Sequence, residues 1–332
     1  MFSRYIRTSW MFIAEKPLKL KEVPVRIFRL TKDESEKLIK RAASRNVFVK
    51  RGFENNFYVG RFKGLADKTI VEVLLPGKPN EVFEEAQNLA DLTERIAFLS
   101  SVLEMDRKAF QVLMGLGQDP KKSFHIIISS DFRRLSSSRN PERRVLGFTI
   151  NKRFTERFEE CCFENLILHC KNTSELSHKV SQTINWLYES RMEPREDAAI
   201  AKTGIALESL LVFDSSENLR KPISERSAYL LSSDPDIRLS INRTFNKFYD
   251  LRSDIVHGRK TKIKNASGLL ECTDRLILLM CLIVSSNKAK WKTKDSMLEW
   301  FEQQKWGSPD LGIKFSFPEE YFYHALRYFP LT

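Results

Sequence analysis

Phe245–Lys260, which reads FNKFYDLRSDIVHGRK, is the most informative segment in the second half of the chain. Its apolar residues recur at spacings of three and four, so they lie on one side of a helix. These residues are Phe245, Phe248, Leu251 and Ile255, and Ile241 continues the same spacing just before the stretch. Gly258 follows at the place where helices commonly end in a left-handed residue. The pattern therefore predicts a buried helix that ends near His257.

Two side chains near this helix end have the chemistry that RNA cleavage requires. Arg252 is permanently charged and forked, which suits it to hold a phosphate through two hydrogen bonds. His257 lies beside the partly negative carbonyls of the helix end, which favour its protonated form, and Asp254 is placed to orient it. Positions five apart differ by about 140° around a helix. One chain therefore brings both side chains together only if Arg252 reaches back, or a second chain completes the site.

This pair resembles the signature of HEPN domains, an arginine followed four to six residues later by a histidine near a helix end. Other segments narrow the resemblance to the Apea-like branch: Gly204–Leu211 (GIALESLL), Ile223–Leu231 (ISERSAYLL) and Tyr249–Arg252 (YDLR). The resemblance covers about residues 175–305. Ser253 takes the place directly after the arginine, where many HEPN domains have Asn, Asp or His.

The resemblance implies a helical bundle that dimerises across this helix and acts as a metal-independent endoribonuclease, without cofactor. In such a mechanism one histidine takes the proton of the ribose 2′-hydroxyl, and another protonates the leaving 5′-oxygen. An arginine stabilises the charge on the phosphate. A twofold axis would bring two copies of Arg252 and His257 into one cleft. Apea-like HEPN proteins resemble prokaryotic antiphage-defence and toxin effectors, which implies an antitoxin or a phage-derived trigger as a partner.

Two further charged residues lie on helices that otherwise look buried, and a buried charge needs a partner. The resemblance favours Glu208 and Arg226 as supports of the site, with Glu208 paired to Arg252 or to Arg226. Ser253 and Asp254 are further supporting residues. The alternative is two exposed residues or a simple structural ion pair.

The same residues are also compatible with a different function. In it, the domain is a non-catalytic HEPN-like module for dimerisation or for binding a nucleotide or RNA. A DNA-binding regulator ranks last, because the sequence has no evident helix-turn-helix with a basic recognition helix.

The net charge of +12 favours a polyanionic partner, most simply RNA, over a basic protein without one. The first 16 residues have no long apolar run and predict no secretory signal. The apolar run Leu276–Val284 is too short to span a bilayer and predicts a core helix. These features predict a cytoplasmic protein without a membrane partner.

The five cysteines are odd in number and lack Cys-x-x-Cys spacing, which suits a reducing compartment. Buried free thiols are the favoured interpretation, and no metal site is expected. The alternative is a zinc site whose ligands would be Cys161, Cys162, His169 and Cys170.

The predicted fold class is α+β, with a mixed domain at residues 1–172 and an all-α HEPN-like domain with an aromatic tail at residues 173–332. Alternation and turn residues predict strands at 24–30, 46–50, 57–62, 69–75 and 123–129. Periodicity and caps predict helices at 31–43, 81–103, 174–191, 194–213, 223–231, 235–257, 266–286 and 293–305. Thr149–Cys170 fits either a strand or a helix.

A basic segment in the first domain is the other candidate for contact with RNA. Ser136–Ser138 and Pro141 predict a flexible loop inside it. The segment is either an RNA-contacting or a sensor surface, which would make this a sensor, regulatory or RNA-contacting domain, or it is a solvated loop. The candidate RNA-binding residues are Arg133, Arg134, Arg139, Arg143, Arg144, Arg259 and Lys260.

Overall fold

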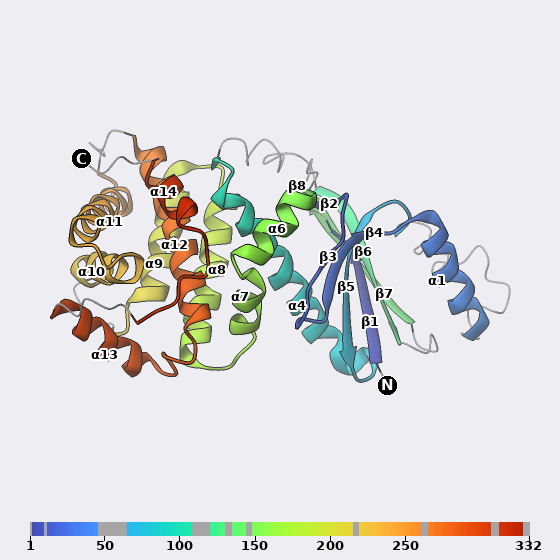
Figure 1. Cartoon of the computed structure of the whole chain (residues 1–332). Helices are drawn as coiled ribbons and strands as arrows, with labels where there is room; N and C mark the ends of the chain where they lie inside the picture. Colours follow the sequence, from blue (N-terminus) through green and yellow to red (C-terminus); the bar gives the residue numbers. More distant parts are fainter. Residues whose placement is uncertain are drawn as a thin grey trace. The chain divides into compact units, whose positions relative to one another are not determined.

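The computed structural model describes residues 2–9, 12–45, 65–107, 120–129, 135–143, 148–214, 219–259, 265–306 and 312–327. It confirms the α+β class (Figure 1). The chain forms two compact units. The first consists of Met1–Glu94 and Gln111–Arg157, and the second of Arg95–Phe110 and Phe158–Thr332.

The first unit contains a six-stranded sheet in the order β3-β4-β5-β1-β6-β7, in which all neighbours are antiparallel. The strands are β1 (Phe2–Thr8), β3 (Leu18–Lys19), β4 (Val25–Arg29), β5 (Thr69–Pro76), β6 (Pro120–Ser129) and β7 (Leu135–Arg143). A separate parallel pair joins β2 (Phe12–Ala14) to β8 (Phe148–Ile150). The strands predicted at 24–30, 69–75 and 123–129 are confirmed as β4, β5 and β6. Those predicted at 46–50 and 57–62 lie outside the described residues.

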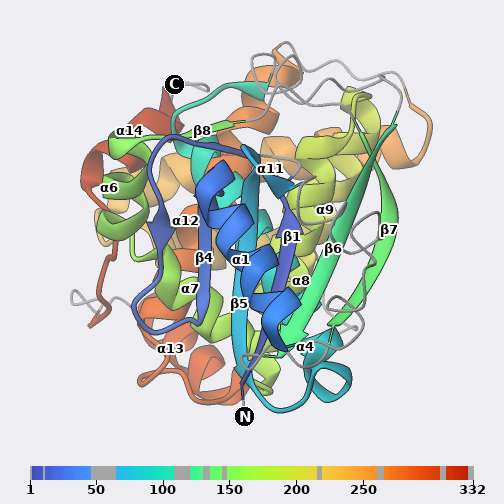
Figure 2. The ribbon, with the colours of Figure 1, turned by 90° about the vertical axis from the view of Figure 1, so that its right-hand side faces the viewer.

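Among the described elements, α4 packs on one face of this sheet and α1 on the other. Side chains along a strand alternate between the two faces. On one face, Tyr5 meets Phe83 of α4 (Pro79–Ser100) edge to face, with ring centroids 6.0 Å apart. On the other face, Ile6 and Ile70 pack with Leu38 of α1 (Lys32–Arg45) in one buried cluster. Figure 2 shows α1 lying across β4, β5 and β1.

The predicted capping box at the start of α1 is confirmed. The N–H of Glu34 donates to Thr31 Oγ1 at 3.3 Å, and the N–H of Thr31 donates to the Glu34 carboxylate at 3.0 Å. These two bonds satisfy backbone donors that the first helical turn would leave free. They fix the point at which the chain leaves β4 for the helix.

The prediction of a flexible loop within the basic segment is wrong. Ser136–Ser138 and Pro141 belong to β7, where Ser137 pairs with Ile126 and Pro141 with Lys122. In the described strand order β7 is an outer strand. A strand in that position tolerates polar residues and a proline, because one of its edges carries no ladder hydrogen bonds.

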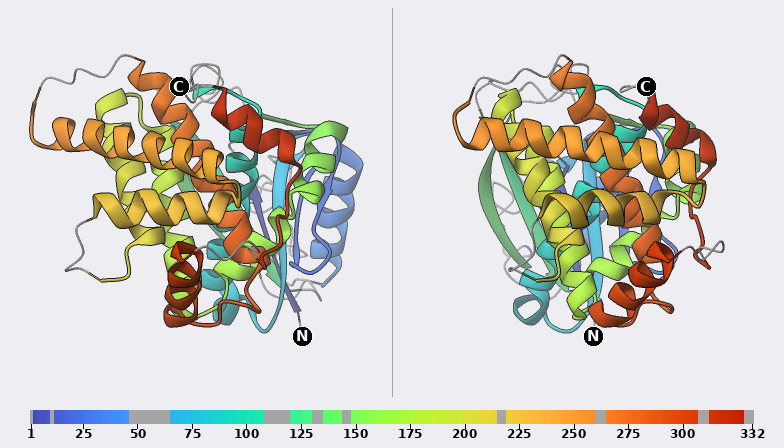
Figure 3. Two further views of the ribbon diagram at one scale, coloured as in Figure 1. Left: turned by 60° about the vertical axis from the view of Figure 1, so that its left-hand side comes forward. Right: turned by 90° about the vertical axis from the view of Figure 1, so that its left-hand side faces the viewer.

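The second unit is helical and is built around α12, which is buried over most of its length. Its helices are α7 (Phe163–Cys170), α8 (Glu175–Met192), α9 (Glu196–Leu211), α10 (Arg220–Leu231), α11 (Pro235–Val256), α12 (Ala266–Ser286), α13 (Lys294–Lys305) and α14 (Glu319–Leu326). Helix α12 contacts α7, α8, α9, α10, α11 and α14. Helices α10 and α11 lie side by side (Figure 3). The predicted helices of this half are confirmed, including the Ser174 cap, whose hydroxyl accepts from Ser177 N–H.

The division between the units falls earlier than the predicted boundary at 172. It passes through α4 and through α6 (Lys152–Glu160), so α7 belongs to the second unit. The reason is that Phe163, Leu166 and Ile167 of α7 are buried, and α7 packs on α8 and α12. The segment between residues 170 and 175 is only the turn from α7 to α8. Among the described helices, none combines the length and apolar content needed to cross a bilayer.

The aromatic tail packs in part. Tyr321 and Phe322 of α14 are buried, whereas Phe315 and Tyr323 are exposed. Tyr328 and Phe329 lie outside the described residues.

Candidate functional site

The end of α11 matches the prediction. His257 is the residue that caps the helix, and its N–H donates to the carbonyl of Ser253 at 3.0 Å. Gly258 has φ of +67°, a left-handed conformation that glycine adopts at little cost. Its N–H donates to the carbonyl of Ile255 at 3.1 Å. The helix therefore stops at the histidine, and Arg252 lies a little more than one turn before it.

Arg252 points toward α9 and forms the predicted ion pair with Glu208. Its Nη2 lies 3.0 Å from Glu208 Oε1, and Tyr249 donates its hydroxyl to the same oxygen at 3.1 Å. The guanidinium carbon of Arg252 lies 5.5 Å from the centre of the Tyr249 ring. One carboxylate thus holds two neighbouring side chains of α11, which restricts the rotamers of the arginine.

Gly204 on α9 makes room for this arrangement. A methyl group at this position would lie 2.9 Å from Cγ of Arg252 and 3.2 Å from its Nε, closer than van der Waals contact allows. The arginine stem therefore lies against a bare backbone, and its side chain is only 20% exposed. Its Nε has no hydrogen-bond partner among the described residues. Thus the guanidinium is held in place without all of its donors being used.

Tyr249 stays a hydrogen-bond donor at all ordinary pH values. Burial, followed by the negative charge of Glu208, raises the pKa of its phenol to about 12. Because the neutral phenol can only donate to the carboxylate, Glu208 accepts from Tyr249 and from Arg252 at once.

His257 is exposed, and its side chain makes no hydrogen bond or ion pair with any described residue. Arg252 turns inward while His257 faces solvent, so within the described chain the two groups do not converge. That outcome follows from their five-residue spacing. Asp254 is partly exposed and shows no hydrogen bond to the imidazole among the described contacts. The orienting role predicted for Asp254 has no support in one chain.

The contacts described for Arg226 differ from the pairing with Glu208 that the sequence suggested. Its Nη1 donates to the carbonyl of Leu211 at 2.7 Å, at the end of α9. Its guanidinium lies 5.3 Å from the ring centre of Phe213 and 5.7 Å from that of Phe301. These contacts tie α10 to the end of α9 and to α13. They fit the structural interpretation of this arginine.

The predicted RNA-binding residues are only partly described. Arg259 is exposed beside the end of α11. Arg139 and Arg143 lie in β7, where they pair in register with Phe124 and Pro120 of β6. The other four candidates are outside the described residues: Arg133, Arg134, Arg144 and Lys260.

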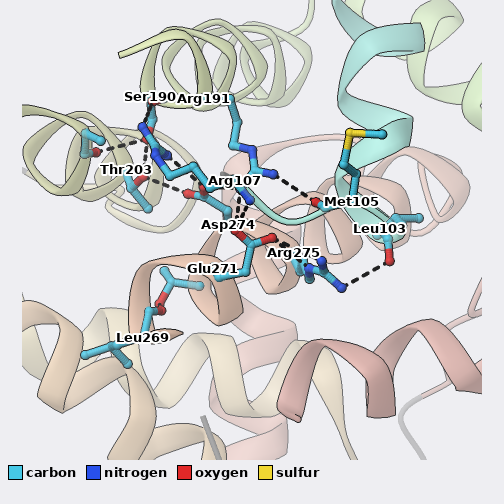
Figure 4. Close-up of polar contacts among 12 residues, drawn as sticks. Leu103, Met105, Arg107, Ser190, Arg191, Thr203, Leu269, Glu271, Asp274 and Arg275 are labelled. Carbon is cyan, nitrogen blue, oxygen red and sulfur yellow. Dashed lines mark hydrogen bonds and ion pairs between the residues drawn. The ribbon is translucent and has the colours of Figure 1, made fainter. Parts of the chain in front are cut away.

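A buried ionic network in the second unit was not anticipated from the sequence (Figure 4). Arg191 Nη1 lies 2.7 Å from Glu271 Oε2 and 3.4 Å from Asp274 Oδ2. Arg275 Nε donates to the other oxygen of Glu271 at 3.1 Å. Arg107 Nη1 lies 3.5 Å from Asp274 Oδ2. These five residues are buried, three of them completely.

Backbone and hydroxyl groups complete the network. Arg191 donates to the carbonyl of Met105 at 3.1 Å, and Arg275 to that of Leu103 at 3.2 Å. Thr203 donates its hydroxyl to Asp274 at 2.8 Å. Burial raises the pKa of the Asp274 carboxyl, while Arg191 opposes that rise. The network connects α8, α9 and α12 to the segment after α4, and it is closed to solvent, so it is structural in character.

The sequence did carry a signal for this network. Glu271, Asp274 and Arg275 stand at spacings of three and four, in a helix whose other positions are mostly apolar. Charged residues on one turn of such a helix need buried partners. The partners come from segments far away in the sequence, and no local pattern names them.

The cysteines and His169 do not form the alternative zinc site. The described residues contain no group of His, Cys, Asp and Glu side chains arranged to hold a metal ion. All five cysteines are free. Burial raises the pKa of the Cys170 thiol to about 12, so it stays protonated and is not a thiolate ligand.

Because of the buried His169, the folded protein is expected to lose stability in acid. Burial, with the charge of Lys288 as a second cause, lowers the pKa of its imidazole from 6.5 to about 4. Between these values the unfolded state binds more protons than the folded state, so stability falls as the pH drops. The expected loss is about 3 kcal/mol over that window.

Urea unfolding of the protein at several pH values between about 7 and 4 measures this effect. His169→Gln is expected to remove much of the pH dependence. His178→Gln, at an exposed position on α8, serves as the matched control and is expected to keep it. Equal pH dependence in the His169 variant and the parent would contradict the assignment.

Compared with protein-family models, with curated proteins and with solved structures, the chain matches none. A function is therefore inferred from the chain's own residues.

Proposed function

We propose that the chain is a metal-independent endoribonuclease of the HEPN type that acts as a homodimer, with Arg252 and His257 as its catalytic residues. The observation that supports this proposal best is the presence of both groups in the last two turns of α11. A guanidinium is fixed by Glu208 and Tyr249, and an imidazole without a side-chain contact to a described residue follows it at the cap of the same helix. A phosphate-binding group and a proton-transfer group are the parts that this reaction needs.

The proposed reaction uses the RNA itself as the nucleophile. One His257 accepts the proton of the ribose 2′-hydroxyl, and the oxygen attacks the neighbouring phosphorus. The bond to the 5′-oxygen breaks, and the His257 of a second copy gives that oxygen a proton. Arg252 stabilises the added charge on the phosphate oxygens. The products are a 2′,3′-cyclic phosphate and a free 5′-hydroxyl.

The proposal includes a second copy of the chain because the reaction needs two imidazoles and each chain offers one at the end of α11. The surface around His257 is compatible with a partner, since Val256 is apolar and 53% exposed. As an effector of this type, the protein would cut cellular RNA in antiphage defence or as a toxin, under the control of a trigger or an antitoxin.

A non-catalytic dimerisation or RNA-binding module is the second candidate, and one observation favours it. Glu208 already occupies part of the Arg252 guanidinium, as it would in an ion pair that only joins α9 to α11. The two proposals differ in whether the protein cleaves RNA and whether Arg252 is required.

The deciding experiment incubates purified protein with labelled total RNA in excess EDTA. We expect cleavage that leaves 2′,3′-cyclic phosphate ends, and a loss of about 100-fold or more in Arg252→Ala. Arg243→Ala, at an exposed position on α11, is the matched control and is expected to cleave as the parent does. Arg252→Lys keeps the charge without the fork, and melting curves of every variant separate loss of activity from loss of fold. Full activity in a folded Arg252→Ala, or cleaved RNA that carries ends other than 2′,3′-cyclic phosphates, would refute the proposed nuclease mechanism.

A further inference from the structure

The first unit contains a pocket between α1 and the sheet, with a volume of about 410 Å³. Its apolar base is formed by residues of the buried cluster beneath α1, namely Ile6, Leu30, Leu38 and Ile70. Its walls are formed by charged residues of β1, β4, β5 and α1 (Figure 2 shows α1 over these strands). A volume in this range is typical of sites for small ligands.

The charge of this pocket is strongly positive. Five cations line it, Arg4, Arg26, Lys37, Lys40 and Arg41, against two carboxylates, Glu34 and Glu72. Both carboxylates are already engaged. Glu72 pairs with Arg4 at 3.1 Å and with Arg26. Glu34 accepts from the backbone N–H and the hydroxyl of Thr31, which lowers the pKa of its carboxyl.

Two of the lysines on α1, Lys37 and Lys40, are placed to meet an external anion. Lys37 and Lys40 are exposed, and neither forms an ion pair with a described residue. They lie one turn apart at most along α1, on the side that lines the pocket. The ammonium group of lysine is a point charge on a flexible stem, so it can move to contact a phosphate.

The sheet side of the pocket offers a surface for a flat ring. The guanidinium carbon of Arg26 lies 4.2 Å from the centre of the Phe28 ring, over its face. The side chain of Arg26 is still 40% exposed. Arginine planes and aromatic rings are the groups on which proteins stack unpaired bases.

We propose that this pocket binds a nucleotide, with the base against Arg26 and Phe28 and the phosphates on Lys37 and Lys40. The proposal shares no residue with the site at Arg252 and does not depend on the nuclease. The nucleotide is either a free small molecule or part of a single RNA strand, and both present the same base and phosphate chemistry.

Binding to the full-length protein is measured by isothermal titration with ATP, GTP, CTP and UTP in turn. A 2′-O-methyl uridine hexanucleotide serves as the strand, because it lacks the 2′-hydroxyl that cleavage would need. Inorganic triphosphate and adenosine are the probes for phosphate alone and base alone. We expect at least one nucleotide or the hexanucleotide to bind at least about tenfold more tightly than triphosphate or adenosine.

The double variant Lys37→Gln/Lys40→Gln is expected to weaken that binding by about tenfold or more. Arg29→Gln/Lys32→Gln removes the same charge from neighbouring residues that do not line the pocket, and it is expected to bind as the parent does. Tight binding of a free nucleotide identifies a small-molecule ligand, and binding of the hexanucleotide alone identifies a strand. Triphosphate binding as tightly as every nucleotide, no binding by any probe, or unchanged binding in the Lys37/Lys40 variant would each overturn the proposal.

Discussion

Replacing His257 with alanine is expected to slow RNA cleavage by at least about 100-fold while the melting temperature stays that of the parent. The imidazole is exposed and makes no side-chain hydrogen bond to a described residue, so its removal takes away no packing. If it moves the proton in the reaction, its loss stops both the attack and the departure of the 5′-oxygen. Initial rates on a labelled RNA in excess EDTA, with a melting curve for each variant, measure the two effects separately.

His178→Ala is the matched control for this substitution, since His178 is also an exposed histidine at a helical surface. It is expected to cleave at the parental rate. Mixed dimers that contain one His257→Ala copy are expected to lose activity as well, because the proposed reaction uses both imidazoles. A His257→Ala protein that cleaves RNA at the parental rate would rule out the proposed mechanism.

Replacing Arg191 with methionine is expected to lower the free energy of unfolding by about 3–5 kcal/mol. Arg191 is completely buried, and it contacts Glu271 and Asp274 together with the carbonyl of Met105. Methionine fills much of the volume but leaves two carboxylates short of a positive partner inside the protein. Breaking one member of a buried ionic group costs far more than the group contributes as a whole. Urea unfolding followed by circular dichroism gives the difference.

Arg195→Met provides the comparison. Arg195 pairs with Asp197 at 2.6 Å, but its side chain is 74% exposed, so solvent replaces the lost partner. The unfolding midpoint of this variant is expected to equal that of the parent. If Arg191→Met also unfolded at the parental midpoint, the network would have no part in holding α8 and α12 together.

Sequence patterns were enough to predict strands β4, β5 and β6, the helices from α8 to α13, and one contact of the candidate site. Helix spacing and caps located α8 to α13, because the period of an amphipathic helix is visible within a single turn or two. Gly258 located the end of α11, and the expected pairing of Glu208 with Arg252 is present at 3.0 Å. The placement of Arg252 and His257 on different sides of the helix also followed from geometry along one helix.

Features that depend on contacts between residues distant in the sequence became visible only in the folded protein. The polar stretch around Ser137 is a strand because β6 lies beside it, and α7 joins the second unit because α12 covers its apolar side. The buried ionic network needs Arg107 and Arg191 to reach α12, and the basic pocket needs α1 to lie over strands that are far from one another in the chain. A charged residue among the apolar positions of a helix indicates that a buried partner is required. Only the packing of distant segments, which lowers the local dielectric and brings the opposite charge within reach, determines which partner it has.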